Sequence, residues 1–331
     1  MITTRRRFLT LAGAAAALPA MPHVARVDLA RAEAAYPDHP VHWIVGQAAG
    51  SSSDITARLI GQFLSEKLGQ QFIIEARPGA AGNIATEFVT RAPADGYTLL
   101  LANAQNTINA ALYEKLNFDF LRDIAPIGGI DLVPLVMEVN PSVPAKTVAE
   151  FIAYAKAHPG KLNYGAGLGT PPHLLSTLFK TQAGLEVTYV PYKGSAPSVT
   201  DLLAGQTQFT IDGMLILMPQ VKQGKLRALA VARGERWPAL PDVPSLAESG
   251  FPDFVVDAWT GVVAPRGTPP QIIGRLNAAI NAGLKTPEMT TALDRFSALP
   301  KGGTPEEFGA LLQQELPKWA AMVKLSGAKG E

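Results

Sequence analysis

Residues 41–69 combine a strand, a loop of very small residues and an amphipathic helix. Residues 41–45 form the predicted strand, and a helix opening at Asp54 repeats apolar side chains every three or four positions until Gly69 ends it. The loop residues are Ala48, Ala49, Gly50, Ser51, Ser52 and Ser53. Because such a loop leaves main-chain N–H groups open at the positive end of the helix dipole, it predicts an anion site. The alternative is an ordinary strand-to-helix turn capped by a serine.

A second unit of the same kind occupies residues 162–184. A strand at 162–164 leads into a loop at 165–170, and the helix at 173–183 opens after two prolines and ends at Gly184. Two such turns in separate α/β domains can face each other across a cleft, which suits a small carboxylate. A dinucleotide fingerprint fits less well, because its third glycine comes one residue early and Glu186 is the only nearby acid. A purely structural turn is the remaining alternative.

Strands and helices alternate along most of the chain. Strands are predicted at 71–75, 97–102, 125–140, 186–190, 208–212, 226–231 and 255–264, and helices at 84–91, 109–115, 148–157, 198–204 and 271–284. This alternation predicts βαβ units with parallel-type sheets. A new α/β set begins near Val139 and the chain returns near Gly261, which predicts domain 1 at 35–138 and 262–331 and domain 2 at 139–261. Two hinge strands would let the domains close on a ligand.

Single polar residues in the second set are further candidates for ligand contact. Lys193, in the turn at 191–197, can pair with an anion, although a solvated surface charge is the alternative. Asp212 ends a predicted strand, where ligand-facing residues of parallel sheets lie, and it suits an orienting or capping role. His173 falls in the first turn of the second helix without an evident Asp or nucleophile partner.

The sequence lacks the signatures of common catalytic centres. It contains no Gly-x-Ser-x-Gly elbow, no His-Glu-x-x-His pair and no cysteine, and its five histidines are scattered. We therefore predict a protein that is not an enzyme and that uses neither a metal nor a cofactor. The formal net charge of +1 over 331 residues gives no indication of a nucleic-acid partner.

The N-terminus predicts export. Residues 4–10 (Thr-Arg-Arg-Arg-Phe-Leu-Thr) resemble a twin-arginine signal, and the apolar run at 9–18 is too short to span a bilayer. Small-residue cleavage patterns end at Ala32 and Ala34. We therefore expect a signal segment at 1–34 and a periplasmic protein.

Several short motifs together resemble the periplasmic solute receptors of tripartite tricarboxylate transporters, the Bug or TctC-like family. The motifs lie at residues 44–54, 75–82, 95–100, 190–194, 224–230, 241–245 and 305–308. The resemblance implies a type II periplasmic-binding-protein fold that holds an organic anion between two domains. It also implies ligand loops at 48–52 and at 165–170 with His173, and a cleft-lining acid at Asp212.

Two departures from the family pattern concern the first loop. Gly46-Gln47 stands where the family usually has Pro-Phe, and Ser51 stands where a glycine is frequent. The loop from Asn103 to Asn109 is also richer in amides than the family pattern. We therefore expect a more polar pocket, suited to a hydroxylated or dicarboxylic ligand.

The resulting hypothesis is a receptor that captures a small organic anion (a mono-, di- or tricarboxylate or an amino acid) and delivers it to membrane permease subunits. An exported cofactor-binding oxidoreductase is the alternative, because the twin-arginine route carries folded, cofactor-loaded proteins. The predicted ligand-binding residues are Gln47, Ala48, Ala49, Gly50, Ser51, Ser52, Asp54, Asn103, Gly167, Leu168, Gly169, Thr170, His173, Lys193, Gly194, Ser195 and Asp212.

Overall fold

The computed structural model describes residues 36–238, 240–295 and 297–329. Every element named below belongs to one compact unit within residues 37–331. The predicted signal segment at 1–34 lies outside the described residues. None of the described helices combines the length and the apolar character needed to cross a membrane.

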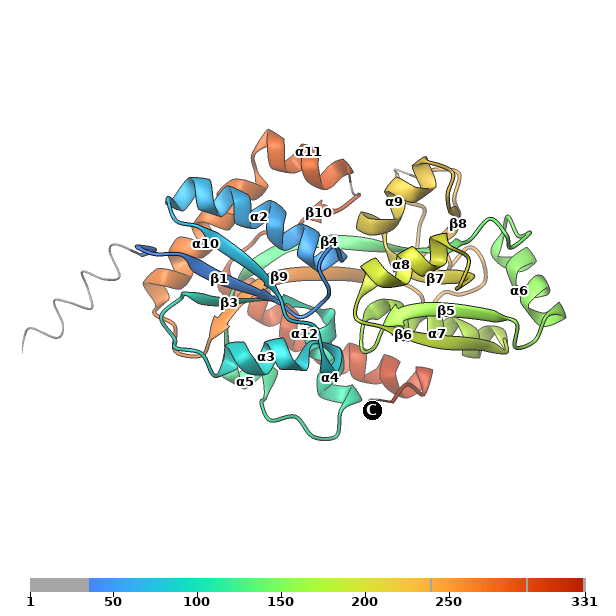
Figure 1. Ribbon diagram of the computed structural model, residues 1–331, viewed down its shortest axis with the longest axis horizontal. Helices are drawn as coiled ribbons and strands as arrows, with labels where there is room; N and C mark the ends of the chain where they lie inside the picture. The colour runs from blue at the N-terminus through green and yellow to red at the C-terminus, as the bar shows by residue number, and fades with distance from the viewer. Residues whose placement is uncertain (1–35, 239, 296, 330–331) are drawn as a thin grey trace, which may run out of the picture. The chain divides into compact units, whose positions relative to one another are not determined.

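The first α/β set is built on three parallel strands in the order β2-β1-β3. Its strands are β1 (Val41–Val45), β2 (Phe72–Ala76) and β3 (Thr98–Asn103). Its helices are α2 (Ser52–Leu68), the 3-10 turn η1 (Ala80–Gly82), α3 (Asn83–Thr90), α4 (Ala104–Leu112) and the short α5 (Phe120–Asp123). Figure 1 shows α2 on one side of these strands and α3 and α4 on the other. The predicted βαβ arrangement is therefore confirmed in this part of the chain.

The second α/β set contains the parallel strands β6-β5-β7. Its strands are β5 (Leu162–Gly167), β6 (Val187–Tyr192) and β7 (Phe209–Gly213). Its helices are α6 (Val148–Ala157), α7 (Pro171–Ala183), α8 (Ser195–Leu203) and α9 (Met214–Lys222). The helix α7 lies against β7 and β5, so its first turn is held beside the end of β7.

Two long strands join the sets into one mixed sheet. They are β4 (Ile124–Val139) and β9 (Asp257–Pro265), and the shorter β8 (Arg227–Val231) and β10 (Leu299–Pro300) pair with β4. From Ile124 to Pro134, β4 pairs with β9, and from Leu135 to Val139 it pairs with β7, always antiparallel. The sheet is therefore parallel within each set and antiparallel where the sets meet. The domain boundaries near Val139 and Gly261 stay a prediction.

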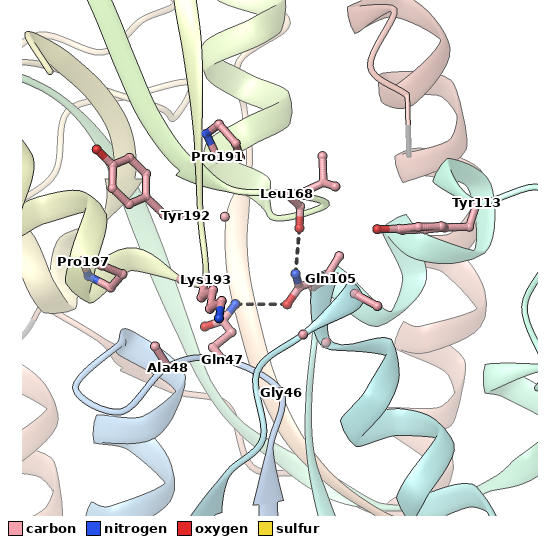
Figure 2. A pocket seen from close by; sticks show the side chains of 16 residues that line it. Gly46, Gln47, Ala48, Gln105, Tyr113, Leu168, Pro191, Tyr192, Lys193 and Pro197 are labelled. Carbon is pink, nitrogen blue, oxygen red and sulfur yellow. Dashed lines mark hydrogen bonds between the residues drawn. The ribbon is translucent and has the colours of Figure 1, made fainter. Parts of the chain in front are cut away.

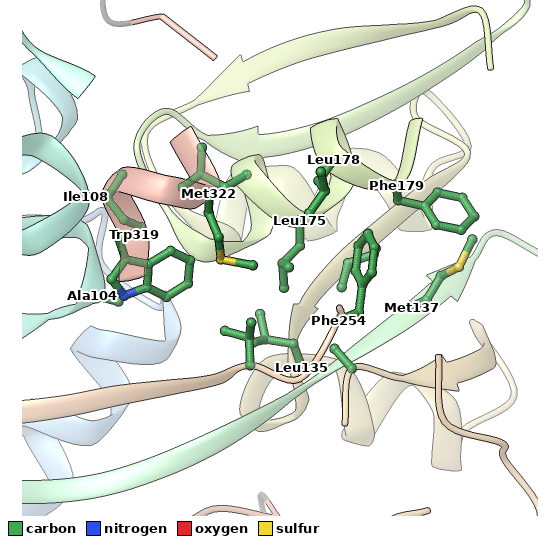
Figure 3. Close-up of a cluster of buried hydrophobic side chains, with 14 of the residues drawn as sticks. Ala104, Ile108, Leu135, Met137, Leu175, Leu178, Phe179, Phe254, Trp319 and Met322 are labelled. Atoms are coloured by element: carbon green, nitrogen blue, oxygen red, sulfur yellow. The ribbon is translucent and has the colours of Figure 1, made fainter. Parts of the chain in front are cut away.

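The C-terminal helices return to the first set. They are α10 (Pro270–Leu284), α11 (Pro287–Arg295) and α12 (Pro305–Ser326). The start of α12 is a capping box, in which the Thr304 hydroxyl accepts from the Glu307 N–H and the Glu307 carboxylate accepts from the Thr304 N–H. Figure 3 shows Trp319 and Met322 of α12 between residues of α4 and residues of α7. The helix therefore contributes to a core shared by both sets.

Three local differences from the predicted elements affect the site. The helix α2 begins at Ser52, two residues before the predicted Asp54, so Ser52 and Ser53 belong to its first turn. The strand β5 continues to Gly167, because its last residues pair with β6, and this shortens the second loop. The helix α9 has no counterpart among the predicted helices, since Pro219 lies inside it.

Candidate functional site

A small cavity of about 50 Å³ lies where the two sets meet, and we name it the inner cavity. It is lined by Gln47, Ser52, Ser53, Thr56, Asn103, Ala104, Val133, Leu135, Thr170, Pro171, Pro172, Ser195, Asp212, Gly213, Ala258, Trp259 and Thr260. These residues come from the starts of α2, α4, α7 and α8, the end of β7, and the middle of β4 and β9. Helix starts from both sets thus converge on one cavity.

The first turn of α2 contributes unused main-chain donors to this cavity. In the part of the chain that the structure describes, the N–H groups of Ser52, Ser53 and Asp54 have no protein acceptor. The serine cap of the alternative interpretation does not form: Ser51 is the N-cap residue, and its Oγ instead accepts from the Ala196 N–H at 3.3 Å. The start of α2 therefore remains open for an anion.

The Asp54 side chain is part of the loop rather than of the cavity lining. Its Oδ2 accepts from the Gly50 N–H at 2.9 Å and from Arg58 Nε at 2.8 Å. Asn103 is likewise partly structural, because its carbonyl oxygen accepts from the Gln105 N–H while its Nδ2 donates to Ser53 Oγ at 3.0 Å. These bonds hold the α2 start against the α4 start.

The second turn offers fewer main-chain donors than the sequence predicted. Pro171 and Pro172 have no N–H, the Thr170 N–H donates to the Gly167 carbonyl, and the His173 N–H donates to Thr170 Oγ1. The Thr170 hydroxyl itself donates to the Gly167 carbonyl at 2.6 Å. Of these two helix starts, that of α2 therefore keeps the open main-chain N–H groups.

Buried acids surround the inner cavity. Asp212 Oδ1 accepts from Ser195 Oγ at 3.1 Å and from the Gly213 N–H at 2.6 Å, and burial raises the pKa of Asp212 to about 6. Asp131 accepts from the Thr56 and Thr260 hydroxyls, and burial raises its pKa to about 6 as well. Burial, with a smaller contribution from the charge of Asp212, raises the pKa of Glu138 well above its ordinary value.

A larger cavity of about 710 Å³, the outer cavity, lies on the other side of Gln47. Its lining residues are Gly46, Gln47, Ala48, Gly79, Ala80, Ala81, Gly82, Gln105, Tyr113, Gly167, Leu168, Pro191, Tyr192, Lys193, Gly194 and Pro197. Gln47 lines both cavities and is only 8% exposed. Gln47 Nε2 donates to Gln105 Oε1 at 3.2 Å, and Gln105 Nε2 donates to the Leu168 carbonyl at 2.8 Å, as Figure 2 shows.

Main-chain contacts also bring the loops of the two sets together. The Ala48 N–H donates to the Lys193 carbonyl at 2.9 Å. Gly194 has a φ of +135°, and a Cβ there would lie 2.6 Å from Ser51 Oγ, so only glycine fits this approach. Together with the bond between Ala196 and Ser51, these contacts connect residues 48–51 to the turn before α8.

The structure distributes the predicted ligand residues unevenly. The inner cavity includes Gln47, Ser52, Asn103, Thr170, Ser195 and Asp212, and the outer cavity includes Gln47, Ala48, Gly167, Leu168, Lys193 and Gly194. Neither lining includes Ala49, Gly50, Ser51, Asp54, Gly169 or His173. The residues absent from both linings shape the loops, and their predicted ligand contact stays untested.

His173 is enclosed by protein. Its ring lies 4.4 Å from the Tyr189 ring, centroid to centroid, and only 4% of the residue is exposed. Burial lowers the pKa of His173 to about 4, so the ring is neutral at pH 7. This environment suits a packed aromatic residue at the start of α7.

Sequence reasoning did not select the cavity residues on β4 and β9. Val133, Leu135, Trp259 and Thr260 read as ordinary strand positions, because only the pairing of two distant strands brings them to the site. The glycine-rich turn at 79–82 was visible as a loop but was not assigned to the ligand. Within the described residues, no group of three or more His, Asp or Glu side chains is arranged to hold a metal ion.

The fold is that of the two-domain α/β periplasmic solute-binding proteins. Residues 56–328 match the model of the tripartite tricarboxylate transporter family receptor, and the chain belongs to this family. The protein BugT of Bordetella pertussis is 36% identical to it over 297 residues, which cover 89% of this chain and 91% of BugT. The family and fold class predicted from the motifs are thereby confirmed.

Two solved structures with bound acids are similar to the chain. The structure of R. palustris Rpa4515 with adipate has a TM-score of 0.85 and 38% identity, covering 89% of this chain and 99% of that one. MatC (Rpa3494) from Rhodopseudomonas palustris with bound malate has a TM-score of 0.83 and 33% identity, covering 87% of this chain and 100% of that one.

Proposed function

We propose that the protein is a receptor that binds a small organic carboxylate with the inner cavity and delivers it to a permease of the tripartite tricarboxylate type. The observation that carries this proposal is the set of three unused N–H groups at the start of α2, two of which belong to residues that line the inner cavity, Ser52 and Ser53. Main-chain donors at a helix start bind carboxylates without requiring an arginine. The acids bound by Rpa4515 and MatC support the same ligand class.

The outer cavity extends the site for longer acids. The exposed Lys193 is the charged side chain of its lining, and it can attract an anion without being buried with it. A ligand whose first carboxylate reaches α2 would place the remainder of its chain beside Gln47 and Gln105. We include export to the periplasm by the twin-arginine-type segment, and the absence of a catalytic step, as parts of the same proposal.

The test is a thermal-shift screen of mono-, di- and tricarboxylates and amino acids, followed by calorimetric titration of the acids that stabilise the protein. A ligand that binds only the folded state raises Tm in proportion to the logarithm of its concentration. Stabilisation by at least one class of carboxylate is expected. The proposal is contradicted if every acid leaves Tm unchanged.

A matched pair of variants tests the role of the α2 start. Ser52→Pro removes one main-chain N–H at the first helical position, where proline is tolerated, and the preceding Ser51 already has the extended φ of −72° and ψ of 162° that proline requires. Ser52→Ala removes only the hydroxyl. We expect Ser52→Pro to weaken carboxylate binding about tenfold more than Ser52→Ala does, at similar Tm of the free variants, because one charge-assisted hydrogen bond is lost. Equal affinities of the two variants would exclude the N–H group as a ligand donor.

A further inference from the structure

Two residues that line the inner cavity each carry a buried oxygen atom for which the described part of the chain provides no hydrogen-bond partner. Ser52 Oγ belongs to the start of α2, and Asp212 Oδ2 belongs to the end of β7. The elements approach closely, because a Cβ on Gly213 would lie 3.5 Å from Ser52 Oγ. Asp212 is only 3% exposed, so water outside the protein cannot satisfy it. Buried polar atoms normally have a hydrogen-bond partner. Because these two oxygen atoms lack one among the described residues, we interpret the cavity as a binding subsite.

The position of the Asp212 carboxylate is fixed by its other oxygen. Oδ1 accepts from Ser195 Oγ and from the Gly213 N–H, which leaves Oδ2 as an acceptor toward the cavity. No lysine or arginine among the described residues forms an ion pair with Asp212. The titratable groups on the elements packed against it include Glu138 on β4, which has no partner, and the neutral His173 on α7. None of these groups supplies a hydrogen-bond donor to Asp212 Oδ2, so a ligand in the cavity can supply one.

The α2 start has the opposite requirement. Its unused N–H groups call for an acceptor, and two of the residues that carry them, Ser52 and Ser53, line the same cavity as Asp212. A cavity of 50 Å³ holds about four water-sized groups, given about 10–15 Å³ for each. A carboxylate with a hydroxyl or ammonium group on the neighbouring carbon has this size and carries the acceptor and the donor side by side.

We propose that Asp212 accepts a hydrogen bond from a hydroxyl or ammonium group on the carbon next to the ligand's carboxylate, so that the receptor selects 2-hydroxy or 2-amino acids. The proposal rests on the proposed function, because it takes the carboxylate to lie at the α2 start. At pH 7.5 the side chain is mainly ionised, since the pKa of Asp212 is about 6, and it is then an acceptor only. An acid without the neighbouring donor leaves Oδ2 buried and unpaired, which penalises its binding.

Calorimetric titration of the wild-type protein at pH 7.5 tests the selection directly. The probes are matched pairs that differ in the second substituent: lactate against propionate, and malate or aspartate against succinate. We expect the substituted acid to bind at least about tenfold more tightly in each pair that binds, and the malate and aspartate arms separate hydroxyl from ammonium. Equal or tighter binding of propionate and succinate overturns the proposal.

The Asp212→Asn variant tests the residue. Ser195 Oγ and the Gly213 N–H both donate, so the asparagine presents its carbonyl oxygen to them and turns its NH₂ group toward the cavity. The acceptor is thereby replaced by a donor of nearly the same shape. We expect the ratio of aspartate to succinate affinity to fall at least tenfold while circular dichroism stays unchanged, because an ammonium group only donates, whereas a hydroxyl can also accept from the new NH₂ group. An unchanged ratio in the folded variant overturns the proposal.

The two proposals fail in distinguishable ways. If no acid of either kind binds, the proposed carboxylate receptor is wrong and this inference falls with it. If propionate or succinate binds as well as its substituted counterpart, only the inference is wrong. The wild-type comparison requires no variant, so it decides the matter even if Asp212→Asn fails to fold.

Discussion

Gly169 shows how one residue sets the approach of the two α/β sets. It precedes the N-cap of α7 with a φ of +69°, and a Cβ there would lie 2.4 Å from Asn109 Oδ1 on α4. Gly184 ends the same helix with a φ of +63°, but a Cβ there would meet nothing within 4 Å. The two glycines share a left-handed conformation and differ in their surroundings. We expect Gly184→Ala to cost about 1 kcal/mol and Gly169→Ala about 1–3 kcal/mol more, measured by urea unfolding. Equal decreases in the free energy of unfolding would show that Asn109 can move aside for the new methyl group without destabilising the protein.

For single residues, the sequence indicated which positions lie near the site better than it indicated what each side chain contacts. The loop at 48–53 was visible because six small residues precede a helical pattern, and Asp212 because it ends a strand. The protein partners of Ser51 and Asp54, the Ala196 N–H and the Gly50 N–H, were not predicted, since they depend on how the loop folds and on what packs against it, and the predicted ligand contact of both residues stays a prediction. No sequence pattern predicted that Glu138 is buried, because a buried acid within an apolar strand is recognised only once its neighbours in the fold are known.

Glu315 connects α12 to the central strands at the scale of elements. Its Oε2 accepts from Trp259 Nε1 on β9 at 2.9 Å and from Trp319 Nε1 at 2.5 Å, and its Oε1 accepts from Lys318. Only 6% of Glu315 is exposed. Two buried indole donors therefore depend on a single side chain.

Replacing Glu315 by an apolar residue leaves both indole N–H groups unpaired. We expect Glu315→Leu to lower the free energy of unfolding by about 2–4 kcal/mol, because each unsatisfied buried donor costs about 1–3 kcal/mol. Glu315→Gln is the matched control, since its carbonyl oxygen can still accept from both indoles and only the partly exposed Lys318 pair is lost. Urea unfolding followed by tryptophan fluorescence measures both variants. Similar stabilities of the two variants would contradict this role of the carboxylate.

The sequence located most elements because local patterns define them. The strand β1 and the helix α6 have the predicted bounds. What local patterns do not contain is the partner of each strand. The antiparallel pairing of β4 with β9, and the change of partner within β4 after Pro134, arise from contacts between residues 70 or more positions apart.

Buried acids make the stability of the whole molecule depend on pH. Glu138 is fully buried, its two carboxyl oxygens have no partner among the described residues, and its pKa lies well above the ordinary 4.5. Between pH 4.5 and that raised pKa, the folded state keeps a proton that the unfolded state has lost. Folding stability therefore falls as pH rises through this range, by up to about 1.4 kcal/mol per pH unit for this one group.

Removing the Glu138 carboxyl should abolish this contribution. Glu138→Met fills a similar volume without a titratable group, and we expect its free energy of unfolding to exceed that of the wild type by an amount that grows as pH rises above 4.5. The comparison is made by urea unfolding at pH 4.5, 6 and 7.5. Taking the difference between the two proteins removes the contribution of groups that titrate alike in both, such as His173, whose lowered pKa makes stability rise with pH. Glu138→Gln keeps a polar group that is neutral at every pH. Its free energy of unfolding should therefore change with pH as that of Glu138→Met does, and the two variants should differ by a constant amount. A difference that stays constant with pH would show that Glu138 titrates in the folded protein as it does in the unfolded chain.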